Sequence, residues 1–199
     1  METVQITLGT EVMVSDPCYT EPTWCQVKLK NVKPGNYYAY HKEHDMGDWG
    51  VRSSMIMVIH EDHINDRLKW RVSPGEVGVD SGQAGIFSYD TYRKDDIVEE
   101  IGLGDGDISF FGMSPWKEMT EAREQESGER WYVSMCSRTL GEKGWGTYSN
   151  GMVSRSGIGD GSYQLFTAKS NRKIVAMCVD FAIEDGPYID FDWYKEVTV

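Results

Sequence analysis

Three short blocks of the sequence combine acidic residues, hydroxyl groups and glycines, which are residue types that can form a polar binding site on loops. The blocks are SDPCYTEPTW (15–24), GEVGVDSGQAGIF (75–87) and VSRSGIGDGSYQLF (153–166). Serine and glutamine donors, glycine backbone and aromatic faces can together hold a polar ligand that contains a ring. If the three loops converge at one end of a sheet, eight side chains face one pocket: Asp16, Tyr19, Asp80, Ser81, Gln83, Ser156, Asp160 and Tyr163.

The same blocks also fit a purely structural interpretation. Glycine permits positive φ, and an Asp side chain can bond to the backbone two residues further on. Asp16-Pro17, Asp80-Ser81-Gly82 and Gly159-Asp160-Gly161 would then serve only as turns that fix the strand register. Both interpretations remain open at this point. Candidates for stacking on the ligand or for anion contact are Trp49, Arg52, Trp145, Tyr148 and Arg155.

Two histidine pairs and one cysteine suggest other chemistry. His41 and His44 (HKEH), and His60 and His63 (HEDH), lie beside carboxylates, and imidazole with carboxylate suits zinc or manganese. Both pairs fall at strand ends or in loops rather than on a helix, so we expect solvated histidines, no metal and no other cofactor. Cys18, in a loop-like segment, is a candidate nucleophile if a histidine lies close to it in space.

The composition excludes several classes of protein. The 199 residues carry 20 Lys and Arg against 32 Asp and Glu, a formal net charge of −12, and duplex nucleic acid binding needs a basic surface instead. No apolar run approaches the ~20 residues of a membrane-spanning helix, and the first residues do not resemble a signal peptide. We therefore expect a cytoplasmic protein with free thiols, in which Cys136 and Cys178 are small core residues.

Period-2 patterns indicate a mostly β fold. Val27 and Leu29 alternate with Lys28 and Lys30, as in a half-buried antiparallel strand. We predict a hairpin of segments 24–32 and 36–44 around Pro34-Gly35. The other predicted strands are 4–8, 11–16, 51–62, 68–72, 76–80 (split from 68–72 by Pro74-Gly75), 83–88, 130–140, 147–157, 162–170, 173–185 and an aromatic edge strand at 188–197.

Two segments are expected to be helical, at Asp90–Ile101 and from Ser114 to Gly128. The predicted architecture is a single domain over 1–199, α+β but mostly β, with antiparallel sheets in a sandwich or open-barrel arrangement and two short helices inserted at about 90–128. Trp193 and Tyr194, on the predicted edge strand, would suit a homodimer contact.

The three blocks, followed by IVAMCVDF (174–181), resemble in order and spacing a family of small bacterial and phage proteins grouped as the domain of unknown function DUF4241. The helical insert lies outside the resemblance. The resemblance implies a shared fold and a bacterial or phage setting, and it implies no established reaction.

The preferred functional hypothesis is a binding protein without chemistry of its own that holds a small polar ligand. In a phage setting the ligand would be a nucleotide-type immune signal of the host, which the protein would sequester. One alternative is a hydrolase that uses Cys18 or the acidic residues Asp16, Asp80 and Asp160. Another is an inhibitor that binds a host protein through its acidic surface.

Overall fold

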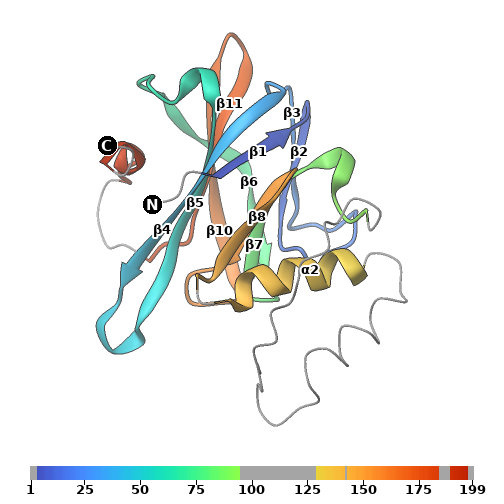
Figure 1. The fold of residues 1–199 in the computed structure, drawn as a ribbon, viewed down its shortest axis with the longest axis vertical. Helices are drawn as coiled ribbons and strands as arrows, with labels where there is room; N and C mark the ends of the chain where they lie inside the picture. Colours follow the sequence, from blue (N-terminus) through green and yellow to red (C-terminus); the bar gives the residue numbers. More distant parts are fainter. Residues whose placement is uncertain (1–3, 95–128, 142, 184–188, 197–199) are drawn as a thin grey trace.

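The computed structural model describes residues 4–94, 129–141, 143–183 and 189–196. Their strands form two antiparallel sheets that face each other without closing into a barrel (Figure 1). The prediction of a mostly β fold with antiparallel sheets is therefore confirmed. In the described part of the chain, no helix has the length and apolar character needed to cross a membrane.

The larger sheet has six strands in the order β1-β4-β5-β11-β10-β6. In that order the strands span Val4–Leu8, Gly35–Asp45, Val51–His60, Lys173–Asp180, Gly161–Ser170 and Trp70–Val79. β4 and β5 form a long hairpin whose turn contains the short 3₁₀ helix η1 (Gly47–Trp49). The predicted strands 162–170 and 173–185 correspond to β10 and β11, which pair as a hairpin, although β11 ends at Asp180; Asn171 and Arg172 at its turn have φ of 48° and 66°.

The smaller sheet has five strands in the order β3-β2-β7-β9-β8. They span Val27–Lys30, Glu11–Ser15, Gln83–Ser88, Gly151–Arg155 and Trp145–Tyr148. The predicted alternation in β3 is confirmed, because Val27 and Leu29 are buried and Lys30 is exposed.

Apolar side chains from both sheets form the main core between them. β5 shows why this sheet needs cover on both faces. Ile56 and Val58 belong to the core between the sheets, whereas Met55, Met57 and Ile59 belong to a second cluster on the outer face. The predicted strand 51–62 is therefore confirmed, and its apolar residues are buried on both faces.

The helix α2 (Glu129–Leu140) covers the outer face of the five-stranded sheet, across β8 and β9 (Figure 1). Trp131 and Met135, four residues apart and thus on one helix face, pack with Phe87 and Tyr148 from the sheet. The prediction of a strand at 130–140 is wrong. The apolar residues of this segment follow a helical spacing, but its Trp, Tyr and Val residues have high strand propensity, which led to the wrong prediction. Cys136, expected in the core, is only partly buried on this helix, whereas Cys178 is fully buried.

Three predictions of where strands end or pair are wrong, because turn signals specify neither the true turns nor the sheet that a strand joins. The predicted strand 147–157 is two strands, β8 and β9, which pair as a hairpin. β3 pairs with β2 and β4 pairs with β1 and β5, so segments 24–32 and 36–44 lie in different sheets and form no hairpin. β6 runs unbroken through Pro74, with a register shift opposite it in β10. Because β6 is an edge strand, the missing N–H of Pro74 breaks no ladder there.

The predicted aromatic edge strand near the C-terminus is also wrong. Trp193 and Tyr194 lie in the 3₁₀ helix η5 (Trp193–Glu196), are 6% and 2% exposed, and pack against Tyr40 on the outer face of the six-stranded sheet. Their burial removes the basis for using them as a dimer contact. The predicted helix from Ser114 lies outside the described residues, as does most of Asp90–Ile101, whose start is the 3₁₀ turn η3 (Tyr89–Thr91).

Candidate functional site

Two of the three predicted loops meet at the carboxylate of Asp16, directly after β2. Asp16 is fully buried. Its Oδ1 accepts from the Cys18 N–H at 2.8 Å and from the Ser81 hydroxyl at 2.6 Å. Its Oδ2 accepts from the N–H groups of Asp80 at 2.8 Å and Ser81 at 2.7 Å. The three donors of Asp80 and Ser81 hold the loop after β2 against the loop after β6, and the Cys18 N–H bonds within the loop after β2 itself.

This arrangement favours the structural role for Asp16. Both oxygens of the carboxylate are engaged with fixed donors, so neither is free to act as a base in a hydrolase. Cys18 is equally unsuited to attack a substrate. Burial and the nearby Asp16 carboxylate raise the pKa of the Cys18 thiol to about 12, which keeps it protonated at neutral pH.

The third loop, between β9 and β10, joins the same end of the molecule. The Ser156 N–H donates to the Gly82 carbonyl at 3.0 Å. The loop is closed on itself, because the Tyr163 hydroxyl donates to Gly159 O at 2.6 Å and the Ser156 hydroxyl donates to the same oxygen at 2.9 Å. The three loops converge as expected, but these polar groups bond to one another. Asp160 is exposed.

Three other predicted site residues, Gln83, Tyr148 and Tyr19, are buried or partly buried. Gln83 is buried and its Oε1 accepts from the Thr139 hydroxyl of α2 at 2.9 Å. Tyr148 lies in the aromatic cluster under α2. Tyr19 is partly buried, and burial raises the pKa of its phenol, which contacts Cys25 and Asp80.

A different pocket gathers positive charge where the β4–β5 hairpin lies beside the segment before β8. Its volume is about 110 Å³. Three cationic side chains and one carboxylate line it, together with small and apolar residues: Glu43, Val51, Arg52, Ser53, Lys143, Gly144, Arg155 and Gly157. Arg52 and Arg155 are both predicted anion contacts. Gly157 places the pocket next to the third loop.

Helix α2 orients Arg155. The guanidinium donates from Nε to Thr139 O at 2.7 Å and from Nη2 to Gly141 O at 3.1 Å, so it caps the carbonyls at the C-terminal end of α2. Gly144 permits this approach. Its φ is +67°, and a Cβ at this position would lie 3.3 Å from Arg155 Cδ.

Arg52, unlike Arg155, has a buried guanidinium nitrogen without an acceptor among the described residues. It lies opposite His44 in the β4–β5 register. Its Nε is buried and has no hydrogen-bond partner within the described part of the chain. A buried guanidinium N–H without an acceptor is unfavourable by about 1–3 kcal/mol or more, so this atom favours an acceptor brought by a ligand.

Ser53 connects the pocket to a buried histidine. Its hydroxyl lies 2.8 Å from His41 Nε2, and the His41 ring stacks on Trp145 with centroids 5.3 Å apart. Burial lowers the pKa of His41 to about 4, so the ring is neutral at physiological pH. Its low basicity makes it a weak general base for Ser53. The expectation of solvated histidines is wrong for one member of each pair, because His41 and His60 are both buried in the sheet.

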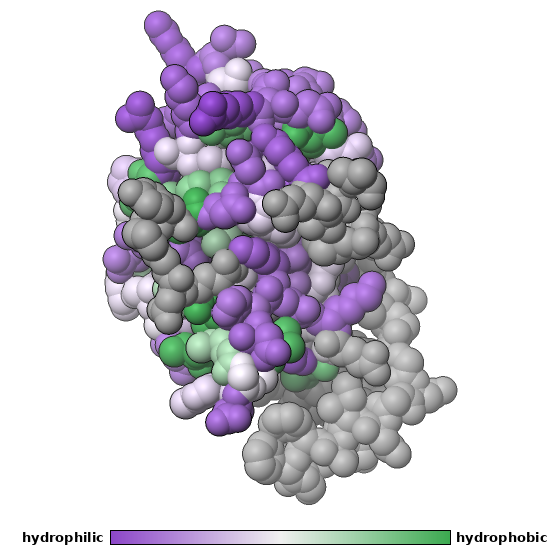
Figure 2. Space-filling model, turned by 90° about the vertical axis from the view of Figure 1, so that its left-hand side faces the viewer, coloured by the Kyte–Doolittle hydropathy of each residue, from purple (hydrophilic) through white to green (hydrophobic). Residues whose placement is uncertain are grey.

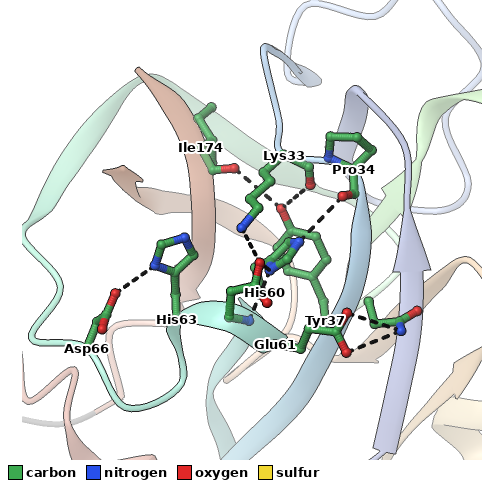
Figure 3. Close-up of polar contacts among 10 residues, drawn as sticks. Lys33, Pro34, Tyr37, His60, Glu61, His63, Asp66 and Ile174 are labelled. Carbon is green, nitrogen blue, oxygen red and sulfur yellow. Dashed lines mark hydrogen bonds and ion pairs between the residues drawn. The ribbon is translucent and has the colours of Figure 1, made fainter. Parts of the chain in front are cut away.

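The second histidine pair lies at the opposite end of the β4–β5 hairpin and forms a satisfied polar cluster (Figure 3). His60 Nδ1 accepts from the Asp62 N–H at 3.2 Å, and its Nε2 lies 3.4 Å from Pro34 O. His63 bonds to Asp66, and Lys33 pairs with Asp62. Within the described ranges, no three His, Cys, Asp or Glu side chains group closely enough to hold a metal ion.

Comparisons with models of known protein families, with curated proteins and with solved structures found no match. Membership of the DUF4241 family therefore remains a prediction from the sequence blocks. The cationic pocket rests on geometry alone. Sequence reasoning missed Glu43, Ser53 and Lys143. Lys143 carried a weak signal, because it lies in a Gly-rich turn (GEKGWG) just before a strand.

Proposed function

We propose that this protein binds a small ligand through an anionic group of phosphate size and does not convert it chemically. The observation that carries the proposal is the pocket of Arg52, Lys143 and Arg155, in which the buried Arg52 Nε has no acceptor in the described part of the chain. Guanidinium groups bind phosphate and carboxylate oxygens with charge-assisted hydrogen bonds.

The charge distribution supports an anionic ligand. The whole chain carries −12, yet three cations face a single carboxylate in this pocket. A cleft lined by one sign of charge focuses the local potential and raises the local concentration of counter-ions. Glu43 limits the positive excess, which favours a ligand with one anionic group over a long polyphosphate.

The size of the pocket defines how much of the ligand it encloses. Water occupies ~30 Å³ in the liquid, and pockets that enclose drug-sized ligands measure ~300–1,000 Å³. A volume of about 110 Å³ suits a phosphate-sized group, with the rest of the molecule outside. Nucleotide-derived ligands belong to this class. A phage protein of this kind would sequester a nucleotide immune signal, a setting that rests on the sequence resemblance alone.

The test is a thermal-stability panel of inorganic phosphate, nucleotides and cyclic nucleotides, followed by heat release and analysis of the ligand. A ligand at ~100 times its dissociation constant adds about 2.7 kcal/mol of stability, which gives a clear shift. We expect a shift with the ligand recovered intact. An altered ligand would favour the hydrolase alternative, and no shift across the panel would overturn anion binding.

Arg52→Gln identifies the site. Because Arg52 Nε has no partner in the described part of the chain, the variant should fold normally without ligand and lose at least about tenfold in phosphate affinity. Arg71→Gln is the matched control, since Arg71 is an exposed arginine of β6 in the same sheet. Equal loss in both variants would mean that general charge, rather than the pocket, binds the anion.

A further inference from the structure

Exposed apolar side chains lie on, or close in sequence to, residues that line the cationic pocket. Val51 lines it and is 59% exposed, and Ile158, which directly follows the lining residue Gly157, is 69% exposed. Trp49, at the end of η1 in the hairpin turn, is 68% exposed. Its Cα lies within about 7 Å of the Val51 Cα, the greatest span of two residues. Figure 2 views the molecule from the hairpin side, and hydrophobic side chains lie among hydrophilic ones at its lower end.

The Trp49 ring has no ring or cation contact among the described residues, whereas Trp70, Trp131, Trp145 and Trp193 pack against other rings. The Trp49 indole, 68% exposed at the hairpin turn, leaves most of its surface accessible to a ligand. A large flat surface beside a pocket that encloses only a phosphate-sized group suits the part of a ligand that remains outside.

We propose that the ligand is a phosphomonoester that carries a flat aromatic ring, and that Trp49 stacks on this ring while Arg52, Lys143 and Arg155 hold the phosphate. This inference rests on the proposed function, because the phosphate must occupy the pocket for the ring to reach the hairpin. Aromatic stacking tolerates different bases, so it sets the class of ligand rather than one identity. Glu43 at the pocket favours a monophosphate with hydroxyl donors close to the phosphate.

The test compares two sugar phosphates, only one of which carries an aromatic base. Ribose 5-phosphate and adenosine 5′-monophosphate are titrated by calorimetry into the full-length protein and into Trp49→Ala and Arg52→Gln. Base stacking on an aromatic side chain corresponds to about five- to 150-fold in affinity, so the wild-type protein should bind the adenosine compound more tightly by a factor in that range. Trp49→Ala should abolish this difference and leave the affinity for ribose 5-phosphate unchanged. Arg52→Gln should weaken both compounds equally.

Trp24→Ala is the matched control, because Trp24 is also an exposed tryptophan, 89% accessible, in the loop before β3. It should preserve the preference for the adenosine compound, and Trp49→Phe should retain most of it. If the wild-type protein binds both phosphates equally, or if Trp49→Ala keeps their affinity ratio, the stacking role is wrong while the phosphate pocket stands. If neither compound binds to the wild-type protein, the proposed function fails first.

Discussion

At the scale of single residues, burial separates side chains with a structural role from those available to a ligand. Asp16 and Arg52 are both charged, but Asp16 receives four donors and Arg52 Nε has no acceptor in the described ranges. The sequence marks both as polar site candidates, because residue type does not reveal whether a partner is present. Only the folded arrangement shows that the carboxylate organises two loops.

His41 makes a prediction about pH. Its pKa of about 4 in the folded protein lies below the ordinary value of 6.5. Between these values the unfolded chain binds the proton and the folded protein does not, so the free energy of unfolding falls as the pH decreases from about 6.5 to about 4. The His41 contribution is at most about 3 kcal/mol, and it is fully retained above pH 6.5. Urea unfolding followed from pH 7 to pH 4 measures it.

His41→Gln should flatten this dependence, since a glutamine amide can still bond to Ser53 without titrating in this range. His44→Asn is the control, because His44 is exposed on the same strand. Burial also lowers the pKa of His60, which leaves a smaller slope of the same sign in His41→Gln. An unchanged slope in His41→Gln would show that His41 protonates freely in the folded state.

At the scale of elements, the docking of α2 is the feature with the greatest effect on the site, because the C-terminal end of this helix orients Arg155. Trp131 anchors the helix, fully buried, edge-on to Phe87 and Tyr92 with centroids 5.1 Å away in both pairs. Trp131→Ala should reduce the free energy of unfolding by about 3–5 kcal/mol, the usual effect of removing a buried aromatic side chain. It should also weaken phosphate binding by releasing Arg155.

Chemical denaturation and phosphate titration measure the two effects together. Trp24→Ala, at an exposed position, controls for the loss of a tryptophan and should change neither. Loss of stability without loss of phosphate affinity in the remaining folded protein would show that Arg155 reaches the pocket independently of α2.

Strands were predicted correctly where the pattern of apolar residues followed directly from burial against a sheet neighbour. In β3 apolar and charged residues alternate because one face of the strand is buried. In β5 both faces are apolar because both are covered. The strand prediction failed for α2. Trp131, Tyr132 and Val133 have high strand propensity, but packing against the aromatic cluster stabilises a helix there. The strand prediction also failed at the C-terminal tail, where burial on an outer sheet face replaced the expected edge pairing.

The candidate site was predictable only in part, for a related reason. Arg52 and Arg155 were named as candidates for anion contact, and the fold brings both to one pocket. Lys143 and Ser53 joined them through the register of β4 with β5 and through the turn before β8. Such contacts depend on long-range strand pairing, and a single sequence does not encode the partner of a strand in a readable way.

At the scale of the whole molecule, the net charge and the pocket predict opposite responses to salt. Like charges repel throughout a chain that carries −12, and screening relieves this repulsion. The Debye length falls from about 10 Å at 0.1 M to about 3 Å at 1 M salt. Sodium chloride should therefore raise the free energy of unfolding over this range. The same salt should weaken phosphate binding, because it screens the attraction of Arg52, Lys143 and Arg155 and supplies competing chloride.

Urea unfolding and phosphate calorimetry at both salt concentrations test the two responses on one preparation. In Arg52→Gln the stability response should persist, because the net charge remains strongly negative, while the affinity should depend less on salt because one cation is gone. A phosphate affinity that is the same at 0.1 M and 1 M salt would contradict a cationic site. A stability that falls with salt would mean that local ion pairs, such as Lys33 with Asp62 and Lys28 with Glu11, outweigh the repulsion across the surface.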